Sequence, residues 1–255
     1  KFDSYISNRF TGDGIGYTAT QNDYNFDFGE GFWSKYNNGS ILTASDSIST
    51  DGRITVGSSG KGDSNGAAYP SVVKDGDLYR MWYGGYDGTN WRIYHATSSD
   101  GYTWFKNDNS IPSASNTTGT NGRLPLGAAG TGDVGNISEA TVIKDGNLFK
   151  MWYTGYDGAN SRIYYATSPD GLTWTKYDNT APARSDTSST NGRIPLGNSG
   201  RGDYSGVSAP AVIKDGNTYK MWYTGQDSGG SRRIYYATSS DGLTWNKYNN
   251  ITPSN

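Results

Sequence analysis

Residues 142–155 read VIKDGNLFKMWYTG, and residues 212–225, 70 positions later, read VIKDGNTYKMWYTG. A third copy, VVKDGDLYRMWYGG, occupies residues 72–85. In an extended chain, successive side chains of the second half of each stretch point to opposite faces. Asp-Gly between two apolar runs is the strongest local sign of a hairpin. The stretch therefore predicts one repeated pair of antiparallel strands.

The repeat extends on both sides of this hairpin. Upstream lie DGRITVGSSGKGD from Asp51, NGRLPLGAAGTGD from Asn121 and NGRIPLGNSGRGD from Asn191. Downstream, each copy continues with RIYHATS or RIYYATS and then with DGYTW or DGLTW, and a Ser-, Gly- and Asn-rich linker leads to the next copy. In the last copy the four expected strands are residues 211–214, 218–224, 233–238 and 244–248.

Four antiparallel strands repeated around an axis are typical of a β-propeller. We expect an all-β fold, with residues 1–255 forming a single propeller domain of four-stranded antiparallel blades. About four blades are visible, or five if part of the ring is missing from this chain. A β-solenoid is the main alternative, but its rungs are usually shorter and lack Asp-Gly hairpins. The expected blades are residues 1–50 (a worn partial copy), 51–120, 121–190 and 191–255.

Composition limits the function classes. The 255 residues carry 22 Lys and Arg against 24 Asp and Glu, a net charge of −2, which gives no general attraction for nucleic acid or an anionic membrane. No apolar run approaches the length of a membrane span. Cysteine is absent, and the single histidine argues against zinc sites and histidine triads. Low charge with abundant Ser, Thr, Asn and Tyr predicts a secreted or surface-exposed bacterial or viral protein, on a cell or a virion.

The pattern A-P-x-V-I-K-D-G-x-x-Y-K-M-W-Y-T-G, followed by R-I-Y-Y-A-T-S-x-D-G-L-T-W, resembles the blades of the five-bladed propellers of glycoside hydrolase family 43. This arabinanase-like architecture is shared with families 32, 62 and 130. The resemblance covers nearly the whole chain and is weakest before Asp51. S-x-D-G-x-T-W also resembles the Asp box of sialidases, which implies a structural, non-catalytic role for Asp100, Asp170, Asp241, Trp104, Trp174 and Trp245.

The family resemblance also implies where catalytic groups would stand. In family 43 a base Asp, an assisting Asp and an acid Glu lie at the mouths of the first strands of successive blades. The matching positions here hold Tyr69, Glu139 and Ala209. Sugar hydrolysis needs two carboxyl groups roughly 5–10 Å apart, and only Glu139 is an acid. Glu139 is therefore the candidate catalytic residue, and a non-catalytic relative of the family is expected.

Trp91 is the one tryptophan outside the repeat, in the loop between the second and third strands of its blade. It would serve as a sugar-stacking platform or as a loop anchor. With Tyr69 and Glu139 it makes up the candidate ligand-binding set. His95 stands where the other copies have tyrosine, which favours a packing or hydrogen-bonding role. Arg201-Gly202-Asp203 spells an integrin-binding tripeptide, but the other copies have Lys-Gly-Asp and Thr-Gly-Asp there, so the repeat explains it.

No cofactor and no metal site are predicted. Asp63, Asp133 and Asp203 lie in Gly-rich loops and offer oxygen ligands that suit calcium. Each of them lacks the D-x-D clustering that makes a calcium prediction strong. Calcium is therefore possible at these aspartates but is not indicated by the sequence.

Two classes of function remain open. The first is a non-catalytic surface or secreted propeller that binds a carbohydrate or glycan surface, or that serves as a structural or adhesive subunit through self-assembly. The alternative is a glycoside hydrolase of the family-43-like group acting on plant or microbial polysaccharide, with Glu139 and an aspartate not located in the sequence. The missing carboxylates favour the first class. In either case Trp82, Trp152 and Trp222 are expected to be buried between neighbouring blades.

Overall fold

The computed structural model describes residues 26–27, 32–33 and 43–251. Within these ranges every regular element is a β-strand. The same part of the chain contains no helix that is long and apolar enough to cross a membrane.

The chain divides into two compact units, Lys1–Leu42 and Thr43–Asn255. In the first unit the described residues form one antiparallel pair, β1 (Phe26–Asp27) with β2 (Phe32–Trp33). Most of the worn blade predicted for residues 1–50 lies outside the described residues. The prediction of a single domain over the whole chain therefore stays a prediction.

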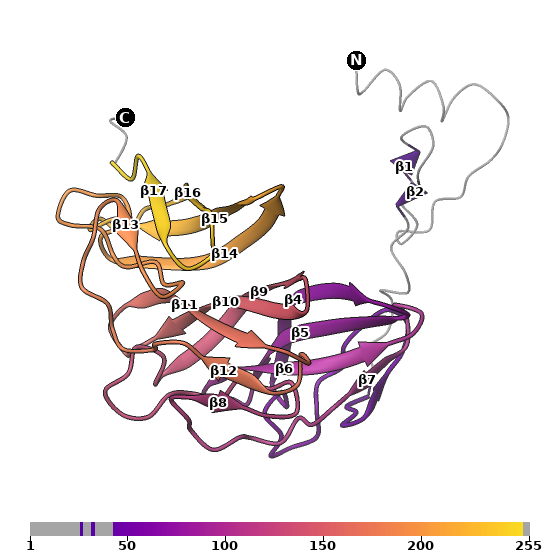
Figure 1. The fold of residues 1–255 in the computed structure, drawn as a ribbon. Helices are drawn as coiled ribbons and strands as arrows, with labels where there is room; N and C mark the ends of the chain where they lie inside the picture. Colours follow the sequence, from indigo (N-terminus) through magenta and orange to yellow (C-terminus); the bar gives the residue numbers. More distant parts are fainter. Residues whose placement is uncertain (1–25, 28–31, 34–42, 252–255) are drawn as a thin grey trace, which may run out of the picture. The chain divides into compact units, whose positions relative to one another are not determined.

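Three antiparallel sheets of five strands make up the second unit (Figure 1). The first contains β3 (Ile48–Ser49), β4 (Gly66–Asp75), β5 (Leu78–Tyr86), β6 (Trp91–Ser98) and β7 (Trp104–Lys106). The second contains β8 (Thr118–Gly119), β9 (Asn136–Asp145), β10 (Leu148–Tyr156), β11 (Ser161–Ser168) and β12 (Trp174–Lys176). The third contains β13 (Ser188–Ser189), β14 (Gly206–Asp215), β15 (Thr218–Gln226), β16 (Arg232–Ser239) and β17 (Trp245–Tyr248).

The all-β propeller-like fold is confirmed, and each sheet has one strand more than the four predicted. The first sheet runs β4-β5-β6-β7-β3, and the other two repeat this order. The additional strand comes from the linker before each repeat and pairs with the free edge of the last strand, as Ile48 does with Phe105. This pairing covers an edge that would otherwise present unpaired backbone groups.

Successive sheets pack face to face through tryptophan. β9 lies against both β4 and β14, so the first strands of the three blades are neighbours. Trp82 of the first blade is fully buried, with its ring 5.7 Å from Phe149 and 5.6 Å from Trp174 of the second. Trp152 is buried in the same way against the third blade. The expected burial fails for Trp222, which is 38% exposed because none of the described sheets follows the third.

Candidate functional site

The first strand of each blade carries the same β-bulge near its start. In β4, Ala68 pairs with Gly84 and Ser71 with Trp82, so that Tyr69 and Pro70 stand opposite the single residue Tyr83. The same shift of register occurs in β9 and in β14. The first bulge residue of each blade has a positive φ: 55° at Tyr69, 52° at Glu139 and 49° at Ala209.

These three bulge residues lie in the left-handed region, which glycine tolerates and other residues seldom adopt. Such a conformation costs on the order of 1–3 kcal/mol per residue, and bulges commonly re-aim a side chain at a functional site. The three residues are Tyr, Glu and Ala, so their backbone geometry is shared while their chemistry differs. The bulges therefore form a row of equivalent positions, the bulge row, at which the three blades differ in side-chain chemistry.

Glu139 is half-buried, and its carboxylate reaches into the bulge of the third blade. Its Oε2 accepts hydrogen bonds from the Thr154 hydroxyl at 2.8 Å and from the Ala209 amide at 3.0 Å. The same Ala209 amide lies 2.9 Å from the Thr154 oxygen. Glu139 thus ties β9 and β10 to β14 and supports the strained backbone of the neighbouring bulge.

The first blade places an aromatic group at the same level. The rings of Tyr69 and Trp91 are 5.4 Å apart, and Trp91 stacks on Tyr86 at 5.1 Å with 22° between the planes. Tyr69 is 47% exposed, and Trp91 and Tyr86 are half-buried. Trp91 is the first residue of β6 and not part of the preceding loop, where the sequence placed it. Its amide donates to the Asn136 side chain of β9 at 2.8 Å, which joins the start of β6 to the second blade. The group is an exposed aromatic surface held in place from two blades.

Gly84 makes room for this aromatic group. A Cβ atom at Gly84 would lie 3.2 Å from the Trp91 ring and 3.3 Å from the Tyr69 ring. The equivalent positions in the other blades are Thr154 and Thr224, by their pairing with Ser138 and Ser208. A threonine at residue 84 would crowd both rings, so the first blade differs from the others at several coordinated positions.

The structure brings Tyr69 and Trp91 together, whereas the Glu139 carboxylate accepts its hydrogen bonds from Thr154 and Ala209. Sequence reasoning missed Tyr86, Gly84 and Thr154. The sequence does contain a signal for Gly84. The other copies have threonine at this position and a polar residue at the position of Trp91, so the first blade differs from them at both. Tyr86 has an equivalent in Tyr156, and only its cross-strand pairing with Trp91 gives it a distinct role.

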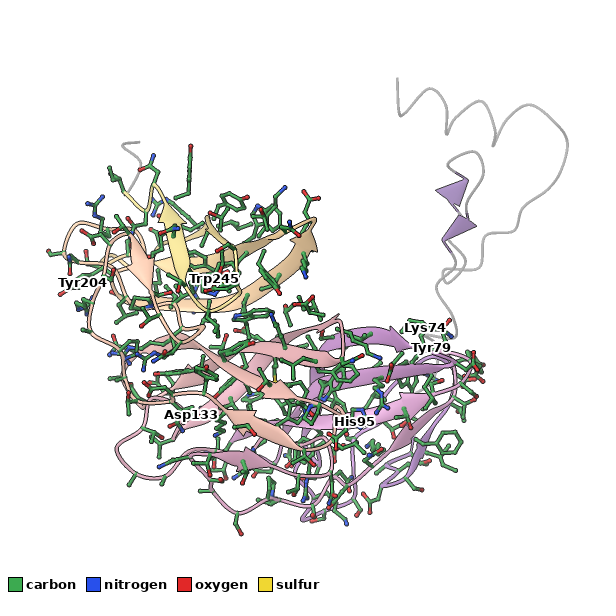
Figure 2. All side chains as sticks on the ribbon, viewed as in Figure 1. Lys74, Tyr79, His95, Asp133, Tyr204 and Trp245 are labelled. Atoms are coloured by element: carbon green, nitrogen blue, oxygen red, sulfur yellow. The ribbon has the colours of Figure 1, made fainter. Side chains whose placement is uncertain are left out.

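The aspartates considered for calcium are buried and already paired with lysine. Asp63 accepts from Lys106 at 2.7 Å, from Asn109 at 2.9 Å and from Tyr83 at 3.0 Å, and both charged side chains are fully buried. The same set recurs around Asp133, seen in Figure 2, and around Asp203. A lysine ammonium occupies the place where a cation would bind. No cluster of three metal-ligating side chains occurs elsewhere in the described ranges.

This burial also determines how the Arg201-Gly202-Asp203 tripeptide is presented. The Asp203 side chain has no exposed surface and is bonded to Lys247, Asn250 and Tyr223. An integrin would need that carboxylate accessible. The tripeptide is a repeated structural feature of the linker, as the sequence predicts.

No family model matches the chain. Two uncharacterized proteins from two strains of Mycobacterium tuberculosis are 30% identical over 203 residues, which is 75% of this chain and 58% of theirs. The chain thus spans little more than half the length of the curated relatives it matches.

Solved structures with a similar fold include glycoside hydrolases. A family 117 glycoside hydrolase of Zobellia galactanivorans has a TM-score of 0.56 at 15% identity, over 80% of this chain and 61% of that one. A glycosyl hydrolase of Bacteroides ovatus has a TM-score of 0.53 at 18% identity, over 74% and 50%. A family 130 structure, described with enzymes that target β-1,2-mannosidic linkages, has a TM-score of 0.51 at 17% identity, over 84% and 61%. The chain therefore has the propeller-like fold of these hydrolases, and likeness at this level of identity concerns the fold alone.

Proposed function

We propose that this protein is a non-catalytic carbohydrate-binding propeller whose sugar site lies at the bulges of β4 and β9. The Tyr69–Trp91–Tyr86 group would stack on a sugar ring, and the carboxylate of Glu139 would read hydroxyl groups nearby. Secretion, or exposure on a cell or virion surface, is part of the same proposal. The observation that carries it is the aromatic group, which is partly exposed, pre-ordered and found in only one of the three blades within residues 43–251.

Stacking favours this function for physical reasons. An aromatic face binds the apolar C–H face of a sugar, and a rigid aromatic group loses little conformational entropy on binding. Trp91 is held through its backbone by Asn136 and through its ring by Tyr86, so its position is set before any ligand arrives. The left-handed bulge at Tyr69 presents a second ring at the edge of the same surface.

Absence of catalysis is proposed because the bulge row offers one carboxylate. Tyr69 and Ala209 stand at the two equivalent positions and cannot act as a carboxylate base. Glu139 Oε2 already accepts hydrogen bonds from the Thr154 hydroxyl and from the Ala209 amide of the neighbouring bulge. Glycoside hydrolysis requires one group to protonate the leaving oxygen and a second to act as base or nucleophile. Glu139 by itself supplies only one of them.

Calorimetric titration with arabinan, xylan and β-mannan oligosaccharides tests binding at this site. The informative variant is Trp91→Ser, because the second blade has Ser161 at the paired position and folds around it. We expect at least one of these sugars to bind the wild-type protein, and Trp91→Ser to weaken that binding roughly tenfold or more, about 1.4 kcal/mol.

Tyr177→Ala is the matched control, since Tyr177 is an aromatic residue that is 50% exposed on the second blade, outside the proposed site. Its affinity should equal that of the wild type. Equal losses in the two variants, or no binding of any sugar of the panel to the wild-type protein, would refute the proposal.

A further inference from the structure

The two internal blade junctions of residues 43–251 have the same construction. At each junction an Ile of one blade forms a β-bridge with the start of the next repeat, Ile93 with Leu124 and Ile163 with Ile194. All four of these side chains are fully buried. Trp82 and Trp152 fill the centre of the two junctions, as described above. One pattern of contacts therefore joins two consecutive pairs of blades.

The third blade presents the trailing half of this pattern without a partner among the described residues. We call this surface the trailing face; it comprises Ile213, Asp215, Trp222 and Ile234. Ile234 is 76% exposed, whereas its equivalents Ile93 and Ile163 are fully buried. Trp222 is 38% exposed, and Ile213 is 50% exposed. Apolar groups exposed together in this way mark an interaction surface.

Within residues 43–251, the first blade presents the leading half of this pattern without a partner. It is formed by Val72, Lys74 and Tyr79, and we call it the leading face. Val72 is 47% exposed, while its equivalents Val142 and Val212 are 4% and 5% exposed because a preceding blade covers them. Lys74 and Tyr79 lie together on the β4–β5 hairpin in Figure 2, with the ammonium 3.8 Å from the ring centre. Tyr79 corresponds to Phe149 and Tyr219, the rings that contact tryptophan at the internal junctions.

Charge matches across the two open faces as well. At the internal junctions an aspartate of one hairpin binds a lysine of the next blade, Asp75 with Lys144 and Asp145 with Lys214. Asp215 is the aspartate of the trailing face, and its side chain is 63% exposed beside Lys220. Lys74 is the exposed lysine of the leading face. The same ion pair can therefore form between the trailing face of one molecule and the leading face of another.

We propose that the trailing face binds the leading face of a second copy of this chain, head to tail. The interface repeats a junction that the molecule already makes twice, with Trp222 placed against Tyr79 and Asp215 against Lys74. The two faces are different surfaces, so the contact is heterologous. It leads to a ring or to an open chain of copies, according to whether the rotation closes.

Sedimentation velocity over a concentration series tests this with the full chain. The wild-type protein is expected to form dimers and longer species as concentration rises. Trp222→Glu destroys only the trailing face and Val72→Glu only the leading face. Because both side chains are already exposed, both variants should keep the wild-type circular dichroism spectrum. Each variant alone should associate roughly tenfold or more weakly than the wild type. It should therefore sediment as a monomer at concentrations at which the wild type forms dimers.

Mixing the two variants gives the decisive result. Trp222→Glu retains an intact leading face and Val72→Glu an intact trailing face, so the mixture should form dimers and nothing longer. Asp215→Lys should weaken association, and adding Lys74→Asp to the same chain should restore it. A wild-type protein that stays monomeric would overturn the proposal. So would dimers of Val72→Glu alone, which indicate contact between two trailing faces, or a mixture that fails to dimerise.

Discussion

His95, the single histidine of the chain, is buried where the other two blades have Tyr165 and Tyr236. Its ring packs 5.0 Å from Trp82, much as Tyr165 packs 5.2 Å from Trp152. Burial lowers the pKa of His95 from 6.5 to about 4; the Arg80 charge acts in the same direction, and a hydrogen bond with Asn107 opposes it. The expected packing role is therefore consistent with a histidine that stays neutral.

This lowered pKa predicts a pH dependence of folding. Between pH 6.5 and 4 the unfolded chain binds a proton at His95 that the folded protein does not, so stability falls as the pH drops through this window. The full effect is on the order of 3 kcal/mol. His95→Tyr, which copies the second blade, should remove most of this loss in urea denaturation measured at pH 7 and pH 4.5.

Carboxylates with lowered pKa values do not account for a loss of stability between pH 7 and pH 4.5. The pKa values of Asp46 and Asp100 are lowered to about 2 by hydrogen bonds, from Ser58 and from the backbone of Thr103 respectively. Their contribution is therefore lost only as the pH falls from about 4 toward 2. A His95→Tyr variant that loses as much stability between pH 7 and 4.5 as the wild type would show that His95 is not the responsible group.

The candidate site could be predicted only in part at this scale. Tyr69, Glu139 and Trp91 stand out because they break the repeat. Their backbone geometry could not be predicted from the sequence. The bulge places Tyr, Glu and Ala in the same left-handed conformation, and these three residue types share no property that would indicate it. The hydrogen bond that Glu139 accepts from the Ala209 amide of the third blade depends on where that blade lies, which the local sequence does not specify.

At the scale of elements, each linker is fastened to its blade by a buried ion pair. Lys247 of β17 binds Asp203 at 2.9 Å and donates to the carbonyl groups of Ser185 and Pro195 in the linker. Burial lowers the pKa of Lys247, and the negative charge of Asp203 opposes this shift. The pair fastens a segment rich in Gly and Ser, alongside its apolar side chains Ile194 and Leu196, which are buried in the hydrophobic core.

Removing one partner of this pair should be costly. Asp203→Asn leaves the Lys247 ammonium buried without its counter-charge, so we expect a loss of about 3–5 kcal/mol in the free energy of unfolding. Lys220→Gln breaks the exposed Lys220–Asp215 pair and should cost no more than about 1 kcal/mol. Equal effects of the two substitutions in thermal or urea unfolding would contradict the structural role of Asp203.

The strands were predictable to the extent that they carry a pattern. Alternation and Asp-Gly turns placed β15 and β16 to within two residues at each end. β14 starts five residues earlier than expected, because the bulge interrupts the alternation around Ala209. The two-residue strands β3, β8 and β13 have no side-chain pattern, since backbone pairing with a neighbouring edge is what creates them.

At the scale of the whole molecule, identical sequence has different surroundings. KMWYTG occurs in the second and third blades, yet Trp152 is fully buried and Trp222 is exposed. The repeat predicts which side chains each blade places on its two faces. The neighbouring blade determines which of these side chains are buried. The bulges follow the same logic, since the bulges of β4, β9 and β14 come near one another only because the blades lie side by side.

We propose that the site at the bulges of β4 and β9 binds sugar and releases it unchanged. Chromatography of arabinan, xylan and β-mannoside oligosaccharides after prolonged incubation with the protein tests it most directly. We expect the sugars to keep their chain lengths with the wild-type protein and equally with Glu139→Gln, because no second carboxylate stands at the equivalent bulges. Shorter products that appear with the wild type and disappear with Glu139→Gln would contradict the claim.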